Sequence, residues 1–295
     1  MDGILCLDKP QDMTSFSCCS VIRRLSGEKK TGHAGTLDPQ ATGVLPILLG
    51  RATKALDLLP VHDKRYIAEV QFGLTSDTLD IWGAVTETGA AHPSLSAVEA
   101  ALIPFRGNIL QVPPMMAALK VEGRRLYDLA REGIEIERQA RPITVYALTL
   151  LSYDEATGRM TLDCHCSKGT YIRTLCDDLG RLLGCGAVMA GLRRVMAAGW
   201  DISSALTLEQ VRQYAEEGTL TRYVLPVESA FAVYPAVSIT APQAVRLTNG
   251  GALSLERVRA AVPTDTPVRV YDPDAHFLGI ARAVGEELVP IKCFV

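Results

Sequence analysis

Asp38 is the residue of this chain whose type and surroundings are best suited to chemistry. It lies in the loop TGHAGTLDPQATGV, where glycines permit backbone angles that side chains forbid and Pro39 biases Asp38 toward an extended conformation. A carboxylate held in this way can act as a nucleophile. The alternative is an Asx-type turn, in which the Asp38 carboxylate accepts a bond from a nearby backbone N–H. Judged from this segment alone, the turn is the simpler interpretation.

Two further segments share the character of this loop. Tyr66 begins the alternating stretch KRYIAEVQFG, and Arg173 lies at the predicted helix start in SKGTYIRTL. The net charge is only −3, but the basic excess falls on residues 1–65, 102–146 and 159–194, which carry these motifs. Scattered solvated side chains would give an excess of this size as well. The three segments taken together nevertheless favour a common site.

Four of the eight cysteines and a histidine lie between residues 164 and 185, which raises the possibility of a zinc site. In the alternating segment RMTLDCHC, however, Cys164 and Cys166 point to one face of a strand and His165 points to the other. The spacing therefore argues against structural zinc, and we expect no metal. The thiols are expected to be reduced and to pack as small hydrophobic groups.

The remaining sequence predicts the elements that position these segments, beginning with a helix and an apolar run. Thr14 or Ser15 can cap a helix that continues through Leu25 and ends at Gly27. The apolar run at 44–49 predicts a buried strand or the start of a helix, which would anchor the Asp38 loop.

Three further patterns complete a mixed α+β fold. Alternation in residues 64–73 predicts a strand of an antiparallel sheet, and residues 159–166 predict another strand that precedes a helix at 171–183. Residues 107–142 are flanked by prolines, contain a short basic helix and resemble an insertion on the sheet. Residues 233–295 change to short strands and turns, which predicts a small β-rich C-terminal domain.

Composition excludes several classes of protein. The 295 residues are 48% hydrophobic and 21% charged, without internal repeats or low-complexity tracts, which is typical of a globular protein. No segment has the roughly 18 consecutive apolar residues of a membrane span, and the N-terminus lacks the pattern of a signal peptide. We therefore expect a cytoplasmic protein without a membrane partner.

The motifs resemble those of the bacterial tRNA pseudouridine synthase B family. The matching stretches are GILCLDKPQDMTS, GHAGTLDPQATGVL, DKRYIAEVQFG, PPMMAALKVEGRRLYDLAREG, CSKGTYIRTLCDDLG and, more weakly, FLGIARAV. The resemblance implies a catalytic domain of pseudouridine synthase type in residues 1–232. This domain would contain a mixed, mainly antiparallel sheet flanked by helices, with a thumb-like insertion at about 107–142 that closes on RNA. Residues 233–295 would form a PUA-like RNA-binding domain.

The resemblance also implies an activity, namely isomerisation of uridine 55 in the T-loop of tRNA to pseudouridine without cofactor or metal. Asp38 corresponds to the family's ionised nucleophile, which attacks either the sugar C1′ or the pyrimidine. Arg173 corresponds to the arginine that pairs with this aspartate and keeps it ionised and aimed. Tyr66 corresponds to the tyrosine that stacks on the flipped base and helps to remove the C5 proton. The alternative for Tyr66 is a core tyrosine whose hydroxyl reaches water.

Further residues correspond to substrate or RNA contacts. His33 matches a histidine that occupies the space left by flipped nucleotides, although a Gly-His-Ala turn is stable without RNA. Asp80 matches an acid near the pocket, and a strand-end cap is its alternative. The other predicted contacts are Lys9, Gly35, Thr36, Lys64 and Lys168, with Arg124 and Arg125 as additional phosphate contacts. Tyr171 and Leu192 would form the wall of the pocket, and the alternative for both is an ordinary core residue. Each charged member of this set could instead be a solvated surface residue.

The expected partner is the T-arm of tRNA, bound by a monomer without an obligate protein partner. Met116 and Ala117 stand where the family usually has Tyr-Ser in PPMYSALK, so an aromatic contact from the insertion is not expected.

Two other functions compete with this interpretation. The sequence Gly-Thr-Leu-Asp is also compatible with an aspartyl-phosphate hydrolase, but such an enzyme needs magnesium and paired acids. The motif contains no Asp-x-Asp, and the chain has no GxxxxGK[ST] loop. The second alternative is an RNA-binding protein that uses the same loop to help tRNA fold. This role and catalysis can coexist.

Overall fold

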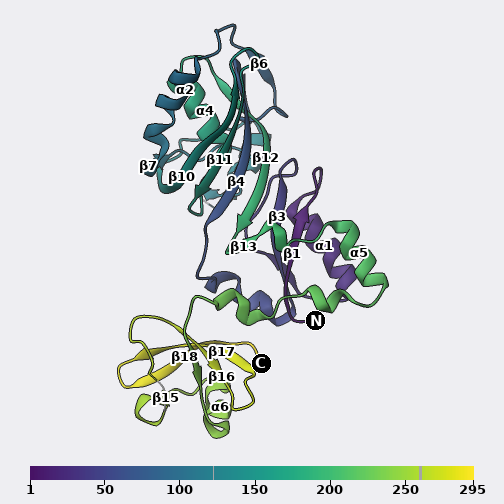
Figure 1. The fold of residues 1–295 in the computed structure, drawn as a ribbon, viewed down its shortest axis with the longest axis vertical. Helices are drawn as coiled ribbons and strands as arrows, with labels where there is room; N and C mark the ends of the chain where they lie inside the picture. Colours follow the sequence, from purple (N-terminus) through teal and green to yellow (C-terminus); the bar gives the residue numbers. More distant parts are fainter. Residues whose placement is uncertain (122, 259–260) are drawn as a thin grey trace. The chain divides into compact units, whose positions relative to one another are not determined.

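The structure is a computed structural model that describes all residues of the chain except 122, 259 and 260 (Figure 1). Its contacts divide the chain into two compact units. The first unit contains Met1–Asp38, Leu45–Val61 and Ala198–Val295, and the second contains Pro39–Val44 and His62–Ala197. The chain passes from the first unit to the second directly after Asp38. Within the described residues, no helix has the length and apolar character that crossing a membrane requires.

The N-terminal part of the first unit is built around strand β3 (Thr42–Leu49), whose last five residues belong to this unit. Strand β2 (Thr31–His33) pairs with it in antiparallel register, and β1 (Gly3–Lys9) is its other neighbour. Helices α1 (Ser15–Ser26) and α5 (Leu208–Glu216) contribute to the same hydrophobic core as β1 and β3. The apolar run at 44–49 is therefore a buried strand, one of the two conformations that its sequence predicts.

Helix α1 has the ends that its sequence predicts. Thr14 Oγ1 accepts a hydrogen bond from the Ser17 N–H at 3.0 Å, and the helix ends at Gly27, whose φ of 67° is left-handed. Thr14 thus pairs one of the N–H groups that the first turn of a helix leaves without an intrahelical partner, and Gly27 lets the chain leave the helix. The direction in which α1 begins is thus fixed by its sequence, which matters for Ser15 in its first turn.

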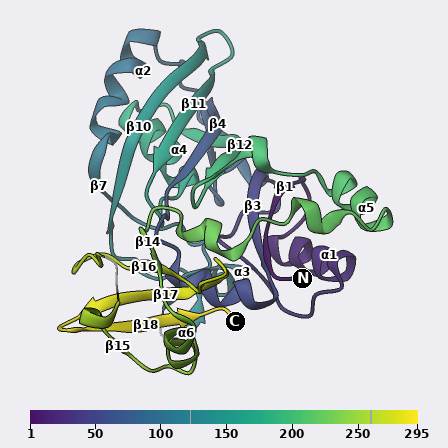
Figure 2. The same cartoon turned by 60° about the horizontal axis from the view of Figure 1, so that its bottom comes forward.

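The C-terminal residues of the first unit form a small β-rich domain, as predicted (Figure 2). Its sheet has the order β14-β16-β17-β18-β15. A hydrophobic core of its own lies between this sheet and α6. The elements are β14 (Ala236–Ser238), α6 (Ala241–Thr248), β15 (Leu253–Ser254), β16 (Val268–Tyr271), β17 (Phe277–Val284) and β18 (Glu287–Cys293).

The second unit is a mixed, mainly antiparallel sheet with the order β3-β12-β4-β11-β10-β7, in which only the short β3–β12 pair is parallel. Helix α4 packs against β12 and β4 (Figure 1). In β4, Tyr66, Ala68, Val70 and Phe72 are buried while alternate residues are not, which confirms the predicted strand. The principal elements are β4 (Lys64–Phe72), β7 (Gly107–Gln111), β10 (Arg141–Asp154), β11 (Arg159–Cys166), α4 (Ile172–Leu182) and β12 (Ala187–Ala197).

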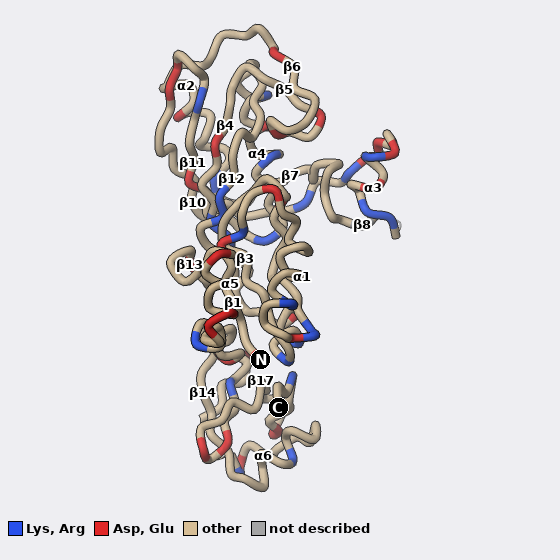
Figure 3. The backbone as a smooth tube through the Cα atoms, turned by 90° about the vertical axis from the view of Figure 1, so that its right-hand side faces the viewer, with Lys and Arg blue, Asp and Glu red and all other residues tan. Residues whose placement is uncertain are grey.

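The insertion begins later in the chain than its sequence predicts. Residues 107–111 form β7, which pairs with β10 from Gly107 opposite Val145 to Gln111 opposite Arg141. A short, largely exposed edge strand carries too little apolar alternation to be recognised from sequence. The inserted segment therefore runs from 112 to 140 and contains β8 (Lys120–Val121), β9 (Arg124–Arg125) and α3 (Leu126–Arg131), around which basic and acidic residues gather (Figure 3).

The smaller elements connect these parts. In the second unit they are β5 (Leu74–Ser76), β6 (Val85–Glu87), α2 (Leu95–Ala101) and the 3-10 helix η2 (Ile103–Phe105). In the first unit they are β13 (Trp200–Asp201) and the 3-10 helices η1 (Gly50–Leu58), η3 (Ile202–Ser204), η4 (Leu220–Tyr223), η5 (Val227–Phe231) and η6 (Leu255–Arg257).

Candidate active site

The loop that carries Asp38 is held by a serine in the first turn of α1. Ser15 Oγ donates to the Leu37 carbonyl at 3.1 Å and accepts from the Leu37 N–H at 2.9 Å. Both residues are buried, whereas Asp38 is half-buried. Gly35 supplies the left-handed turn of the loop with a φ of 104°. The backbone immediately before Asp38 is therefore fixed at both of its polar groups.

Ser15→Ala is expected to lower both stability and turnover. The change leaves the buried N–H and C=O of Leu37 unpaired, which costs about 1–3 kcal/mol, and it releases the backbone next to Asp38. We expect a melting temperature lower by roughly 3–10 °C and a kcat lower by about tenfold. Ser26→Ala, at the end of the same helix, is the control, because Ser26 Oγ makes long bonds, donating to the Arg23 carbonyl at 3.5 Å and accepting from the Glu28 N–H at 3.3 Å. Equal effects of the two substitutions would exclude a specific role of Ser15.

Lys9 differs from its predicted role. Its side chain is fully buried, and Nζ donates to the carbonyls of Pro10 at 2.8 Å and Met13 at 2.7 Å. The ammonium group therefore closes the turn between β1 and α1 and is not displayed toward a phosphate. Sequence could not distinguish the two roles, because burial of a lysine in this turn depends on the packing around it.

His33 lies beside a basic groove in the first unit. It is half-buried in β2, and the groove, with a volume of about 480 Å³, is also lined by Arg23, Lys29 and Lys30. Phe16, which is 75% exposed, contributes an aromatic side chain to the same groove. Residues of α1, of β2 and of the segment between them line the groove. Basic residues beside an exposed aromatic ring are suited to bind nucleic acid.

Tyr66 is held by a buried arginine that sequence analysis did not single out. Arg194 on β12 lies opposite Tyr66 on β4 and forms a hydrogen bond with it. The Arg194 side chain is fully buried, and its Nε donates to the Val44 carbonyl at 2.7 Å. Burial lowers the pKa of Arg194 from its ordinary value, while the Tyr66 phenol acts in the opposite direction. A charged residue in the apolar strand AGLRRVMA was the signal that could have identified it.

Arg173 connects three segments of the second unit. Nη1 donates to the Thr78 carbonyl at 3.2 Å and lies 3.8 Å from Asp80 Oδ2, while Nη2 donates to the Met116 carbonyl at 2.8 Å. The residue is 6% exposed. Asp80 is in turn oriented by Thr78 Oγ1, which donates to Oδ1 at 2.7 Å. The structure thus brings Asp80 and Arg173 together, and Met116 participates through its backbone.

The other predicted residues of the second unit lie nearby in the fold or on its surface. Tyr171 is the N-cap of α4, and Leu192 lies opposite Ala68 on the neighbouring strand. Burial lowers the pKa of Lys64, and the Arg194 charge lowers it further. Lys168 is exposed, as are Arg124 and Arg125 in the inserted segment.

A cavity of about 620 Å³ adjoins Arg173 in the second unit. Its walls include Thr78 and Met116, whose carbonyls accept from the arginine, and residues of α4 and of the inserted segment. Thr174 contributes to the wall, and its buried Oγ1 has no hydrogen-bond partner. The contacts of Arg173 are therefore made at the margin of an open volume.

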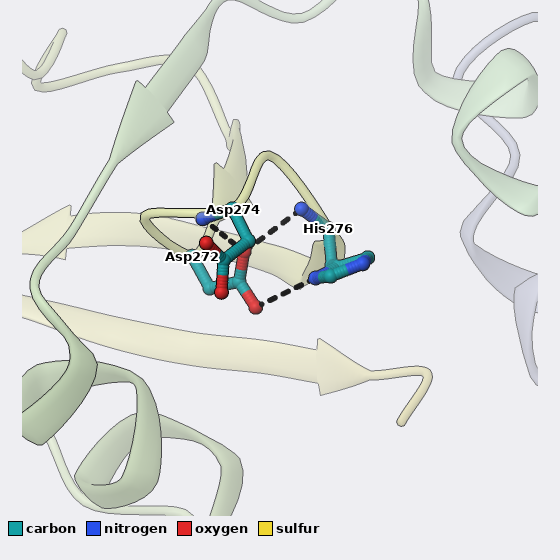
Figure 4. Close-up of side chains that lie close together, drawn as sticks. All are labelled: Asp272, Asp274 and His276. Atoms are coloured by element: carbon teal, nitrogen blue, oxygen red, sulfur yellow. Dashed lines mark hydrogen bonds and ion pairs between the residues drawn. The ribbon is translucent and has the colours of Figure 1, made fainter.

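A group of three side chains with metal-binding chemistry, Asp272, Asp274 and His276, occurs among the residues with described structure (Figure 4). The Asp272 carboxylate already accepts from the Asp274 N–H at 2.9 Å, the His276 N–H at 2.8 Å and the His276 ring at 3.1 Å. These bonds lower the pKa of Asp272, with the His276 backbone as the largest cause. The three side chains thus form a turn that is closed by its own hydrogen bonds.

Cys164 and Cys166 are buried on one face of β11, as predicted.

Asp38 ends the first segment of the first unit, and Arg173 belongs to the second unit. Each of the two residues is positioned within its own unit. The two hydrogen bonds between Ser15 and Leu37, the Ser15–Leu37 clamp, hold the backbone before Asp38. Contacts with Thr78, Asp80 and Met116 hold Arg173. The pairing of Asp38 with Arg173 stays a prediction.

Comparison with known proteins places this framework in context. Residues 23–172 match the model of the TruB family pseudouridylate synthase (N terminal domain), 173–232 match the tRNA pseudouridylate synthase B C-terminal domain, and 235–292 match the pseudouridine synthase II TruB, C-terminal model. The chain is 39% identical to a Clostridium kluyveri protein named tRNA pseudouridine synthase B, with 100% of both chains covered. It is 41% identical to the protein of the same name from Clostridium acetobutylicum, with 99% of each covered.

Solved structures show the same fold at lower identity. An H/ACA RNP bound to a substrate RNA containing 2′-deoxyuridine contains a chain with a TM-score of 0.75 and 22% identity. A Cbf5-Nop10-Gar1 complex contains one with a TM-score of 0.75 and 24% identity. In both cases 99% of this chain and 85% of the other are covered.

Proposed function

The chain belongs to the TruB family of pseudouridylate synthases, and on this premise we propose that it isomerises uridine 55 in the T-loop of tRNA to pseudouridine. The observation that carries the proposal is the relationship to tRNA pseudouridine synthase B proteins over the full length of the chain. The fixed loop of Asp38 and the buried guanidinium of Arg173 support it, because they provide a carboxylate and a cation on defined backbones.

The proposed reaction moves the sugar from N1 to C5 of the uracil. The N1–C1′ bond breaks, the C5–C1′ bond forms, C5 loses its proton and N1 gains one, so the isomerisation is balanced without an oxidant or a reductant. Asp38 begins the reaction as the nucleophile, on either C1′ or the pyrimidine. Arg173 keeps the carboxylate ionised and aimed. The uridine must first be flipped out of the stacked T-loop, which removes stacking that protein side chains replace.

Tyr66→Phe is expected to separate two functions of this side chain. The ring would still stack on the base, but the hydroxyl that bonds Arg194 and assists removal of the C5 proton is lost. We expect the single-turnover rate to fall by about 10²-fold while the Kd for tRNA changes less than about threefold. Tyr153→Phe is the control, because its hydroxyl donates to the Pro93 carbonyl elsewhere in the unit. An unchanged rate in the Tyr66 variant would leave this residue with a stacking role only.

The basic residues of both units support binding to an RNA loop. In the first unit, Arg23, Lys29 and Lys30 line the groove beside His33. In the second unit, Arg124, Arg125 and Arg131 border a shallow depression in the inserted segment. Phosphate contacts of this kind fix orientation and register. They also explain how a chain with a net charge of −3 can bind a polyanion.

The experiment that tests the proposal is tritium release from a full-length tRNA transcript labelled at C5 of uridine. One tritium should be released per tRNA, with or without EDTA, since no step uses a metal. A matched transcript with cytidine at position 55 should release none above background. Tight binding of tRNA without tritium release would instead support the RNA-folding role and reject catalysis.

A further inference from the structure

Gln111 is a buried glutamine whose side-chain amide bonds the backbone of Tyr171, 60 residues later in the sequence. It pairs with both the N–H and the C=O of that residue, as the backbone of a neighbouring strand would. Its Nε2 donates to the Tyr171 carbonyl at 3.0 Å, and its Oε1 accepts from the Tyr171 N–H at 2.8 Å. Gln111 is 4% exposed and is the last residue of β7. Both polar groups of the Tyr171 backbone thus bond the Gln111 side chain, and the carbonyl also accepts from the Leu175 N–H of α4 at 3.1 Å.

Tyr171 is the residue on which the direction of α4 depends. It is the N-cap of this helix, and its own side chain makes no capping hydrogen bond. Arg173 lies two residues later, in the first turn. Because a helix is stiff, a shift or rotation at its N-cap is transmitted directly to side chains of the first turn. The position of the Arg173 guanidinium therefore depends on how Tyr171 is held.

The segment from Gln111 to Met116 contacts the start of α4 at two points. Gln111 bonds the Tyr171 backbone, and the Met116 carbonyl accepts from Arg173 Nη2 at 2.8 Å. Pro113 and Pro114 restrict the backbone between these contacts. The same segment lines the 620 Å³ cavity, so dense packing does not secure it on that side. Specific hydrogen bonds must then carry more of the positioning.

We propose that Gln111 is a positioning residue for Arg173, acting through the backbone of Tyr171 without touching the RNA. This inference rests on the proposed catalytic role of Arg173. It goes beyond a contribution to stability, because it requires that loss of the two Gln111 bonds slows the reaction in molecules that remain folded.

Gln111→Glu provides a test whose pH dependence is specific to these two bonds. An ionised glutamate can accept from the Tyr171 N–H, but its second oxygen would face the Tyr171 carbonyl, and the two acceptors repel. The protonated acid, however, has one donor and one acceptor like the native amide. Burial raises the pKa of a carboxylic acid, so protonation is reached at mildly acidic pH. Lowering the pH should therefore restore both bonds in this variant.

The measurement is the single-turnover rate of tritium release from tRNA, with the protein in saturating excess so that partial unfolding leaves the rate constant unchanged. We expect the Gln111→Glu rate to be lower than wild type by about 30-fold near pH 7.5 and by less than about fivefold near pH 5.5. Gln111→Met, which lacks both bonds at every pH, should show a constant deficit. The Kd for tRNA should change by less than about threefold in either variant.

Gln71→Glu is the matched control, because Gln71 lies on β4 of the same sheet and donates to the Phe72 and Thr157 carbonyls. Its rate should stay within about threefold of wild type at both pH values. A wild-type rate for Gln111→Glu near neutral pH, or a deficit that does not shrink on acidification, would overturn the positioning role. A wild-type rate for Gln111→Met would overturn it independently of how well the glutamate variant folds. If wild type and Gln71→Glu released no tritium, the proposed function itself would fail.

Discussion

Replacing Asp38 by asparagine is expected to reduce pseudouridine formation by at least about 10³-fold. The amide has the same shape as the carboxylate and leaves the Ser15–Leu37 clamp intact, but it is not a nucleophile. Binding of tRNA should therefore stay within about threefold of wild type. Tritium release under single-turnover conditions measures the first quantity, and filter binding measures the second.

Asp57→Asn is a suitable control for this substitution. Asp57 is an exposed aspartate of η1 in the same unit, so its amide variant removes one negative charge from the unit without changing the Asp38 loop. It should retain wild-type rates. Turnover by Asp38→Asn at the wild-type rate would remove the nucleophile assignment, whereas a parallel loss of tRNA binding would show that Asp38 acts in recognition.

Replacing Arg173 by lysine is expected to lower the rate by about 10²-fold at constant tRNA affinity. Lysine keeps the charge but not the planar fork. A single ammonium group cannot reproduce the two Nη donors that bond the Thr78 and Met116 carbonyls while lying beside Asp80. The positive charge at position 173, which we propose pairs with Asp38, would therefore no longer be held in a fixed direction.

Arg181→Lys tests whether any arginine of α4 has this effect. Arg181 lies on the same helix, its side chain is 74% exposed, and it pairs with Asp177 at 2.8 Å. Because the arginine of this pair is exposed and a lysine can also reach the Asp177 carboxylate, we expect a rate within about twofold of wild type. A wild-type rate for Arg173→Lys would reject the directional pairing, and equal losses in the two variants would assign the effect to α4 as a whole.

Much of the local structure follows from sequence. The Thr14 and Gly27 ends of α1 and the alternation in β4 are encoded by residues close together in the chain, and both were predicted. The Thr207 and Gln210 capping box of α5 is likewise formed by residues close together in the chain. The contact of Asp80 with Arg173 was not predicted, because the two residues lie far apart in the sequence and no local pattern links them.

The supporting residues of the site could not be predicted from local patterns. From the sequence alone, Ser15 is an ordinary residue at a helix start, and Gln111 would be expected to be an exposed residue shortly before two prolines. Their hydrogen bonds to Leu37 and Tyr171 cross 22 and 60 residues. The buried Arg194 likewise bonds the Val44 carbonyl, which is 150 residues away in the sequence. Lys9 bonds the nearby carbonyls of Pro10 and Met13, and its burial depends on the packing around that turn. A polar or charged residue within a largely apolar stretch is the signal common to Gln111 and Arg194.

The most direct test of the central claim is to map pseudouridine at nucleotide resolution in an unmodified T-arm hairpin after incubation with the purified protein. We expect complete conversion of the single uridine that corresponds to position 55, with every other uridine unchanged and no conversion by Asp38→Asn. Absence of pseudouridine with the wild-type protein, or conversion at other uridines instead, would contradict it.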